Sequence, residues 1–111
     1  MAKIERTRGD TYAIEYTVRR KSDLSAIDIT GFSFLLTVDI SSTPVDDSNN
    51  LFQIAGVITD AVNGVVEFRY TLVEADQEPG KYYFDVQLTD ASGKIRTLEK
   101  DDYIIKQDIT K

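Results

Sequence analysis

The sequence predicts an all-β protein organised as a sandwich of two sheets. Its clearest signal is a two-residue alternation along 81–89, where apolar side chains occupy one phase and polar side chains the other: Tyr82, Phe84, Val86 and Leu88 against Lys81, Asp85 and Gln87. This period is that of a half-buried strand and not of a helix. Similar stretches recur about every ten residues with turn signals such as Asn63-Gly64 between them. Strands so short and so closely spaced favour a sandwich over alternating strands and helices.

The elements are expected in a simple order along the chain. Strands are predicted over 3–7, 11–19, 32–40, 51–59, 64–71, 81–89, 93–98 and 102–108. The Arg8-Gly9-Asp10 turn separates the first two strands, and a solvated loop over 41–50 follows the third. The segment 72–77 predicts one short helical turn that bridges the two sheets before Glu78-Pro79-Gly80 ends it. The fold class is therefore an immunoglobulin-like antiparallel β-sandwich of about seven to nine short strands, without the Cys-Trp-Cys core of antibody domains.

Composition excludes several classes of function. The 111 residues form a single domain spanning 1–111, and the chain contains no cysteine and no histidine. Zinc sites built on those ligands, thiol nucleophiles and Ser-His or Cys-His catalytic arrangements are therefore excluded. A net charge of -6 argues against nucleic-acid binding. Because the chain shows neither a signal-peptide core nor an apolar run of membrane-spanning length, we expect a soluble protein made in the cytoplasm.

Three polar motifs suggest chemistry, and each has a structural alternative that we favour. Arg8-Gly9-Asp10 matches the integrin-type tripeptide, but Gly-Asp before a strand is ordinary turn chemistry. The hard oxygen ligands of the 41–50 loop suit calcium, although the spacing of an EF-hand is missing, so a solvated acidic loop is the alternative: Asp46, Asp47, Asn49 and Asn50. Asp101 and Asp102, with Glu99 nearby, resemble an acid/base dyad, yet neighbours on a strand point apart.

Aromatic residues and two phase outliers suggest a binding surface. The six tyrosines could form a platform for sugars, but most lie on the apolar phase of their strands and are expected in the core: Tyr12, Tyr16, Tyr70, Tyr82, Tyr83 and Tyr103. Tyr83 lies instead on the polar phase beside Asp85 and Gln87, and Leu35 is a similar outlier on its own strand. If the two strands are neighbours in one sheet, these four residues form a candidate interface.

An ordered set of short motifs covers nearly the whole chain and resembles one family. Its most specific member is Tyr82-x-Phe84-Asp85-Val86-Gln87. The members before it in the chain are Arg8-Gly9-Asp10-Thr11, Ile27-Asp28-Ile29-Thr30-Gly31, Ile58-Thr59-Asp60 with Gly64, and Pro79-Gly80-Lys81, and those after it are Gly93, Thr97-Leu98 and Asp108-Ile109-Thr110. The set is similar to phage virion structural proteins with the immunoglobulin-like amino-terminal domain of baseplate upper proteins and tail-fibre attachment modules. The resemblance implies a glycine that lets the backbone turn after Thr97-Leu98, and this chain has Lys100-Asp101-Asp102 there instead.

The resemblance implies an assembly role without catalytic residues or a cofactor. We expect a non-enzymatic virion protein of a phage or prophage, placed in tail, baseplate or head, that contacts other virion proteins and forms a homo-oligomer, trimeric or higher. No nucleic-acid or membrane partner is expected. Lys3, Arg6 and Arg8 are expected to keep the first edge strand soluble. The alternative is a carbohydrate-binding or adhesin-type sandwich, which the absence of tryptophan weakens, and a two-carboxylate glycosidase is remote.

Overall fold

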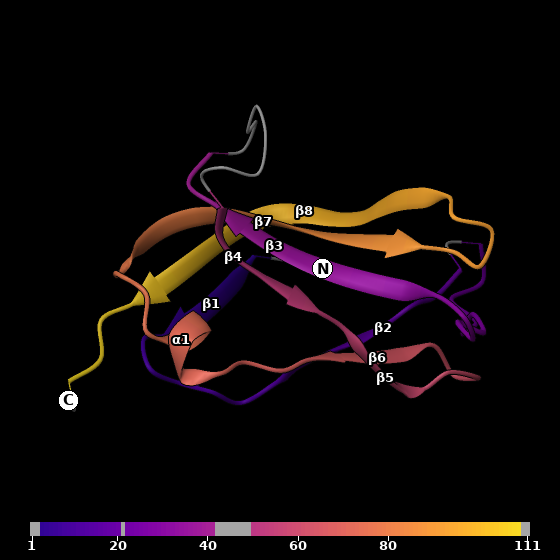
Figure 1. Ribbon diagram of the computed structural model, residues 1–111, viewed down its shortest axis with the longest axis horizontal. Helices are drawn as coiled ribbons and strands as arrows, with labels where there is room; N and C mark the ends of the chain where they lie inside the picture. The colour runs from indigo at the N-terminus through magenta and orange to yellow at the C-terminus, as the bar shows by residue number, and fades with distance from the viewer. Residues whose placement is uncertain (1–2, 21, 42–49, 110–111) are drawn as a thin grey trace.

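A computed structural model of the chain describes residues 3–20, 22–41 and 50–109, which form two sheets packed face to face (Figure 1). The five-stranded sheet has the order β1-β8-β7-β3-β4 and the three-stranded sheet the order β2-β6-β5. The elements are β1 (Ile4–Thr7), β2 (Ile14–Thr17), β3 (Ser33–Asp39), β4 (Asn50–Ala55), β5 (Val57–Asp60), β6 (Val65–Phe68), α1 (Leu72–Ala75), β7 (Gly80–Thr89) and β8 (Ile95–Lys106). The all-β sandwich and the helical turn between the sheets are confirmed. No helix in the described part of the chain is long and apolar enough to span a membrane.

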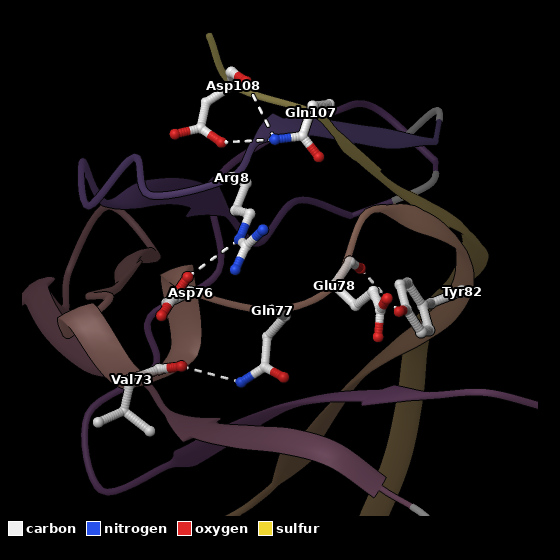
Figure 2. Close-up of polar contacts among 8 residues, drawn as sticks. All are labelled: Arg8, Val73, Asp76, Gln77, Glu78, Tyr82, Gln107 and Asp108. Carbon is white, nitrogen blue, oxygen red and sulfur yellow. Dashed lines mark hydrogen bonds and ion pairs between the residues drawn. The ribbon is translucent and has the colours of Figure 1, made fainter. Parts of the chain in front are cut away.

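The strand order is that of an immunoglobulin-like domain. β7 lies between β8 and β3, with β4 beyond β3, as in the sheet of a variable-type domain, and β2, β6 and β5 form the opposing sheet. Tyr82 adds a local signature near the start of β7, because its hydroxyl donates a hydrogen bond to the carbonyl oxygen of Glu78 at 2.7 Å (Figure 2). This is the tyrosine corner of such folds. Two residues later, where antibody domains have their second cysteine, Phe84 is 2% exposed.

The core is built from the apolar phases that the sequence showed. Phe34, Leu36 and Val38 of β3 and Phe84 and Val86 of β7 are all buried. From the opposing sheet and the segment after it come the buried side chains of Val66, Phe68 and Tyr70, as predicted. Burying each large side chain of this kind stabilises the fold by roughly 1.5–3 kcal/mol.

The predicted first strand, β1, lies at the edge of the five-stranded sheet. β1 pairs in parallel with β8 and not with the strand that follows it, so the turn after it carries the chain from one sheet to the other. Arg6 is 5% exposed instead of protecting the edge. Its guanidinium lies 3.9 Å from the ring centre of Tyr12 and 4.0 Å from that of Tyr70, and its Nη2 donates to the carbonyl oxygens of Asp10 and Tyr12. Tyr12 therefore covers a buried cation and stays 60% exposed instead of entering the core.

The predicted strand over 51–59 is two strands that belong to different sheets. β4 pairs with β3, whereas β5 pairs with β6, and Gly56 lies between them. A Cβ atom at this position would lie 2.7 Å from Cγ2 of Val66 and 2.9 Å from Cβ of Phe34. Only glycine lets the backbone pass this closely between the sheets.

The predicted strands over 93–98 and 102–108 are one continuous strand, β8. It pairs with β7 along its whole length apart from one irregularity opposite Val86 and Gln87. The bulge accommodates an extra residue without interrupting the strand. Lys100-Asp101-Asp102 therefore lies within β8, and no glycine is needed there.

Candidate functional site

The outer face of the five-stranded sheet brings the four predicted interface residues together. β3 and β7 are hydrogen-bonded neighbours, and the cross-strand register places Leu35 opposite Gln87, Thr37 opposite Asp85 and Asp39 opposite Tyr83. These positions have the phase opposite to that of the buried Phe34 and Phe84. We call Leu35, Thr37, Tyr83, Asp85 and Gln87 the outer face. All five side chains are half-buried, so the surface is a packed platform.

Charged residues from β7 and β8 flank Tyr83. Lys81 places its Nζ 5.7 Å from the centre of the Tyr83 ring and 3.5 Å from Oδ2 of Asp102. Lys100 lies opposite Asp85 in the register. Sequence reasoning missed Lys81, Lys100 and Asp102 as members of this surface. Recognising that β8 continues through 100–102 would have placed Lys100 and Asp102 there.

A small hollow of about 70 Å³ adjoins Tyr83 on this face. Its lining comes from three strands and from the residue that begins the 41–50 loop: Thr37, Asp39, Ser41, Tyr83, Phe84, Asp85 and Lys100. Tyr83 is half-buried and lines the hollow, so part of its side chain is open to a partner. The hollow fits a single small side-chain group and is too small for a drug-sized ligand.

Asp39 is the buried carboxylate of this region, at 4% exposure. It accepts hydrogen bonds from the backbone N–H of Ser41 at 2.9 Å and from Nδ2 of Asn50 at 2.8 Å. It therefore ties together the two ends of the 41–50 loop. The candidate calcium ligands Asp46, Asp47 and Asn49 lie outside the described residues. Within the described ranges, no group of three or more acidic, cysteine or histidine side chains is placed to hold a metal ion.

The Arg8-Gly9-Asp10 turn follows β1 and contacts the end of α1, and Figure 2 shows the Arg8–Asp76 contact. Arg8 Nε contacts Oδ1 of Asp76 at 3.0 Å, the backbone N–H of Arg8 donates to the carbonyl of Lys106, and that of Gly9 donates to the carbonyl of Ala75. A shallow hollow of about 480 Å³ lies between residues 7–10 and 107–109. Because the backbone and the arginine are both engaged, the tripeptide acts here as a structural junction.

The candidate acid/base residues do not converge. Asp101 lies opposite the core residue Phe84, and Asp102 opposite Tyr83, so the two carboxylates occupy opposite faces of the sheet. Glu99 lies instead beside Tyr16 of β2. Burial, together with the charge of the Glu99 carboxylate and a hydrogen bond to it, raises the pKa of Tyr16 to about 12.

The tyrosines are divided between the core and separate surfaces. Tyr70 and Tyr103 are buried, with their hydroxyl oxygens 2.6 Å apart. Burial raises the pKa of both hydroxyls, so both are neutral in the folded protein. Tyr83 lies on the outer face, while Tyr12 stacks on Arg6. This placement gives no shared aromatic platform for a sugar.

Comparisons with known proteins identify the fold. No model of a protein family matches the chain, and no curated protein matches its sequence. The structure is similar to CopC from Methylosinus trichosporium OB3b, with a TM-score of 0.57 and 8% identity over 100% of this chain and 90% of that one. It is also similar to the N-terminal domain of phage TP901-1 ORF48, with a TM-score of 0.56 and 14% identity over 96% of this chain and 84% of that one. At these identities the likeness shows a shared β-sandwich fold.

Proposed function

We propose that this domain is a non-enzymatic structural protein of a phage or prophage particle, which docks other virion proteins on the outer face of its five-stranded sheet. The observation that supports the proposal most strongly is the register that aligns Leu35 with Gln87 and places Tyr83 and Asp85 beside them. The two phase outliers, Leu35 and Tyr83, and the two polar neighbours of Tyr83, Asp85 and Gln87, lie on two adjacent strands and form one continuous surface. The ordered sequence motifs and the similarity in fold to a phage protein domain support the virion assignment.

The composition of the outer face fits a protein partner. Leu35 and Tyr83 offer apolar and aromatic contact area, and Gln87 offers an amide that both donates and accepts. Lys81, Lys100 and Asp102 supply charges of both signs around them. Protein interfaces commonly combine an aromatic and apolar centre with a polar rim. A mixed rim of this kind favours one orientation of the partner over others.

The absence of catalytic chemistry is part of the same proposal. The chain has no histidine or cysteine, and its candidate carboxylate pair is divided between two faces of a sheet. The domain then works by position, in several copies around a tail, baseplate or head.

Co-expression with the proteins encoded by the neighbouring genes tests the proposal. The wild-type chain is expected to co-purify with one of them, and Gln87→Arg and Tyr83→Ala are expected to abolish the complex. Thr59→Arg, an exposed change on β5 of the other sheet, is the matched control and is expected to keep it. If no neighbouring protein binds, or if the outer-face variants bind as the control does, the proposal fails. Binding of the isolated domain to a glycan array would favour the carbohydrate alternative instead.

A further inference from the structure

The edge strands of the two sheets, called margin strands below, differ in their protection against pairing with a strand of another molecule. β1, β2 and β5 are margin strands of four residues each, and every one of them contains a charged residue. β4 is the margin strand with six residues, Asn-Leu-Phe-Gln-Ile-Ala, and contains none. Charged side chains and short length keep margin strands from pairing with other chains. Among the described margin strands, β4 alone lacks both protections.

The uncovered part of β8 shows how such protection operates in this chain. β1 covers only Tyr103–Lys106, so residues 95–102 of β8 pair with β7 on one side alone. That stretch carries an irregularity and the charged residues Arg96, Glu99, Lys100, Asp101 and Asp102. Both features oppose strand addition. The contrast singles out β4 as the open margin suited to a further strand.

The backbone of β4 presents hydrogen-bonding groups toward this open side. The N–H of Gly56 donates to the carbonyl of Phe34 on β3 at 2.8 Å. Because hydrogen-bonding direction alternates along an antiparallel strand, Ile54 and Phe52 also face β3, and Gln53 and Ala55 face away from it. An irregularity at the start of the strand, next to Leu51, leaves 52–55 in regular register. Within the described residues, β4 pairs with β3 only.

We propose that β4 pairs antiparallel with β4 of a second copy of this chain, around a two-fold axis at Gln53. In this register Gln53 faces Gln53 of the second copy, and the two exchange backbone hydrogen bonds. Phe52, which is half-buried at the margin, faces Ile54 of the other copy on the core side of the sheet. The interface is the same patch on both copies, as two-fold symmetry requires.

A second copy is the occupant because the strand is complementary to itself. Each cross-strand pair over 52–54 joins two apolar side chains or two amides, so no charge is left facing an apolar group. A net charge of -6 on each chain opposes close approach of two copies, yet β4 keeps the contact itself free of charge. The two five-stranded sheets then form one continuous sheet, and the two outer faces become one extended surface. The proposal does not depend on what docks on that surface.

Charge substitutions at Gln53 test the pairing. Its side chain is exposed, and its Nε2 donates a hydrogen bond to Thr37 Oγ1 at 3.2 Å, so Gln53→Lys and Gln53→Glu leave the core intact. Sedimentation velocity is expected to show a dimer for the wild type and a dissociation constant raised roughly fivefold or more for each variant, because like charges then lie directly opposite. An equimolar mixture of the two variants is expected to dimerise again. Thr97→Lys, on the open part of β8, is the control and is expected to dimerise as the wild type does.

Cross-linking tests the register. The chain has no cysteine, so Gln53→Cys provides a single thiol. Hydrogen-bonded antiparallel partners have Cα atoms about 5.5 Å apart, within the range of roughly 4.4–6.8 Å that a disulfide spans. Mild oxidation is expected to give a covalent dimer of Gln53→Cys and not of Thr97→Cys. A monomeric wild type at all concentrations, a mixture that stays monomeric, or equal cross-linking at both positions would overturn the proposal.

Discussion

The buried hydroxyl pair of Tyr70 and Tyr103 allows a quantitative test of the core. The two oxygens lie 2.6 Å apart, and the residues are 7% and 1% exposed. Phe52 packs edge-on against both rings, with centroids 5.9 Å away in each case. The pair comes from opposite halves of the sandwich, since Tyr70 follows β6 and Tyr103 lies in β8. Its hydrogen bond therefore joins the two sheets across the core.

The expected cost depends on whether one hydroxyl or both are removed. Tyr103→Phe leaves the Tyr70 hydroxyl buried without this partner, which should lower the free energy of unfolding by about 1–3 kcal/mol. Tyr70→Phe should cost a similar amount. The double variant removes both polar groups together and should lie within about 1 kcal/mol of the wild type. The sum of the two single effects should therefore exceed the double effect by at least about 1 kcal/mol.

Urea unfolding of the four proteins, followed by tyrosine fluorescence and circular dichroism, measures this coupling. Tyr82→Phe serves as the control, because its hydroxyl bonds to the Glu78 carbonyl away from the pair. Its effect should add to that of Tyr103→Phe. Additive effects of Tyr70→Phe and Tyr103→Phe would refute the cross-core hydrogen bond, provided that the dependence on urea is unchanged.

Three further changes probe the sheet crossing, the Tyr16 site and the first strand. Gly56→Ala should lower the free energy of unfolding by about 1–3 kcal/mol in thermal or urea melts, because its Cβ would overlap Val66 and Phe34. An unchanged free energy of unfolding would contradict the close contact of the Gly56 backbone with these two side chains. The pKa of Tyr16 is about 12 in the folded protein and near 10 in the unfolded chain, so the free energy of unfolding should fall as pH rises from 10 to 12. Tyr16→Phe should flatten this fall, and a pH profile identical to that of the wild type would contradict the raised pKa. Hydrogen bonds with Lys106 and Lys3 lower the pKa of Glu5, so the stability that this carboxylate contributes is present above its pKa in the unfolded chain and is lost as pH falls through its pKa in the folded protein. Glu5→Gln should therefore speed amide exchange in β1 at neutral pH and remove the increase in exchange at acidic pH. Exchange equal to that of the wild type would exclude this role of Glu5.

The sequence predicted those parts of the fold that depend on local periodicity. The alternation in β3 and β7 identified both their buried and their outward residues, and the Asn63-Gly64 turn located the β5–β6 hairpin. The same alternation selected Leu35 and Tyr83, because a residue out of phase with its strand is visible without knowledge of the partner strand; Asp85 and Gln87 were included as the polar neighbours of Tyr83 on its strand.

The features that the sequence did not reveal depend on distant parts of the chain. The burial of Arg6 requires rings from Tyr12 and Tyr70, which belong to separate segments. The crossing at Gly56 interrupts an apolar run that reads locally as one strand. Lys100-Asp101-Asp102 has the composition of a turn, yet pairing with ten-residue β7 holds it extended. In each case tertiary contacts override a local preference.

Photo-cross-linking in assembled particles tests the docking role of the outer face most directly. A photoreactive amino acid at position 87, and separately at position 59 on the opposite sheet, would be introduced in cells that produce the particle. Cross-links from position 87 to another virion protein, and none from position 59, are the predicted result. Absence of the chain from purified particles, or cross-links from position 59 alone, would contradict the proposal that this sheet face binds the domain into a virion.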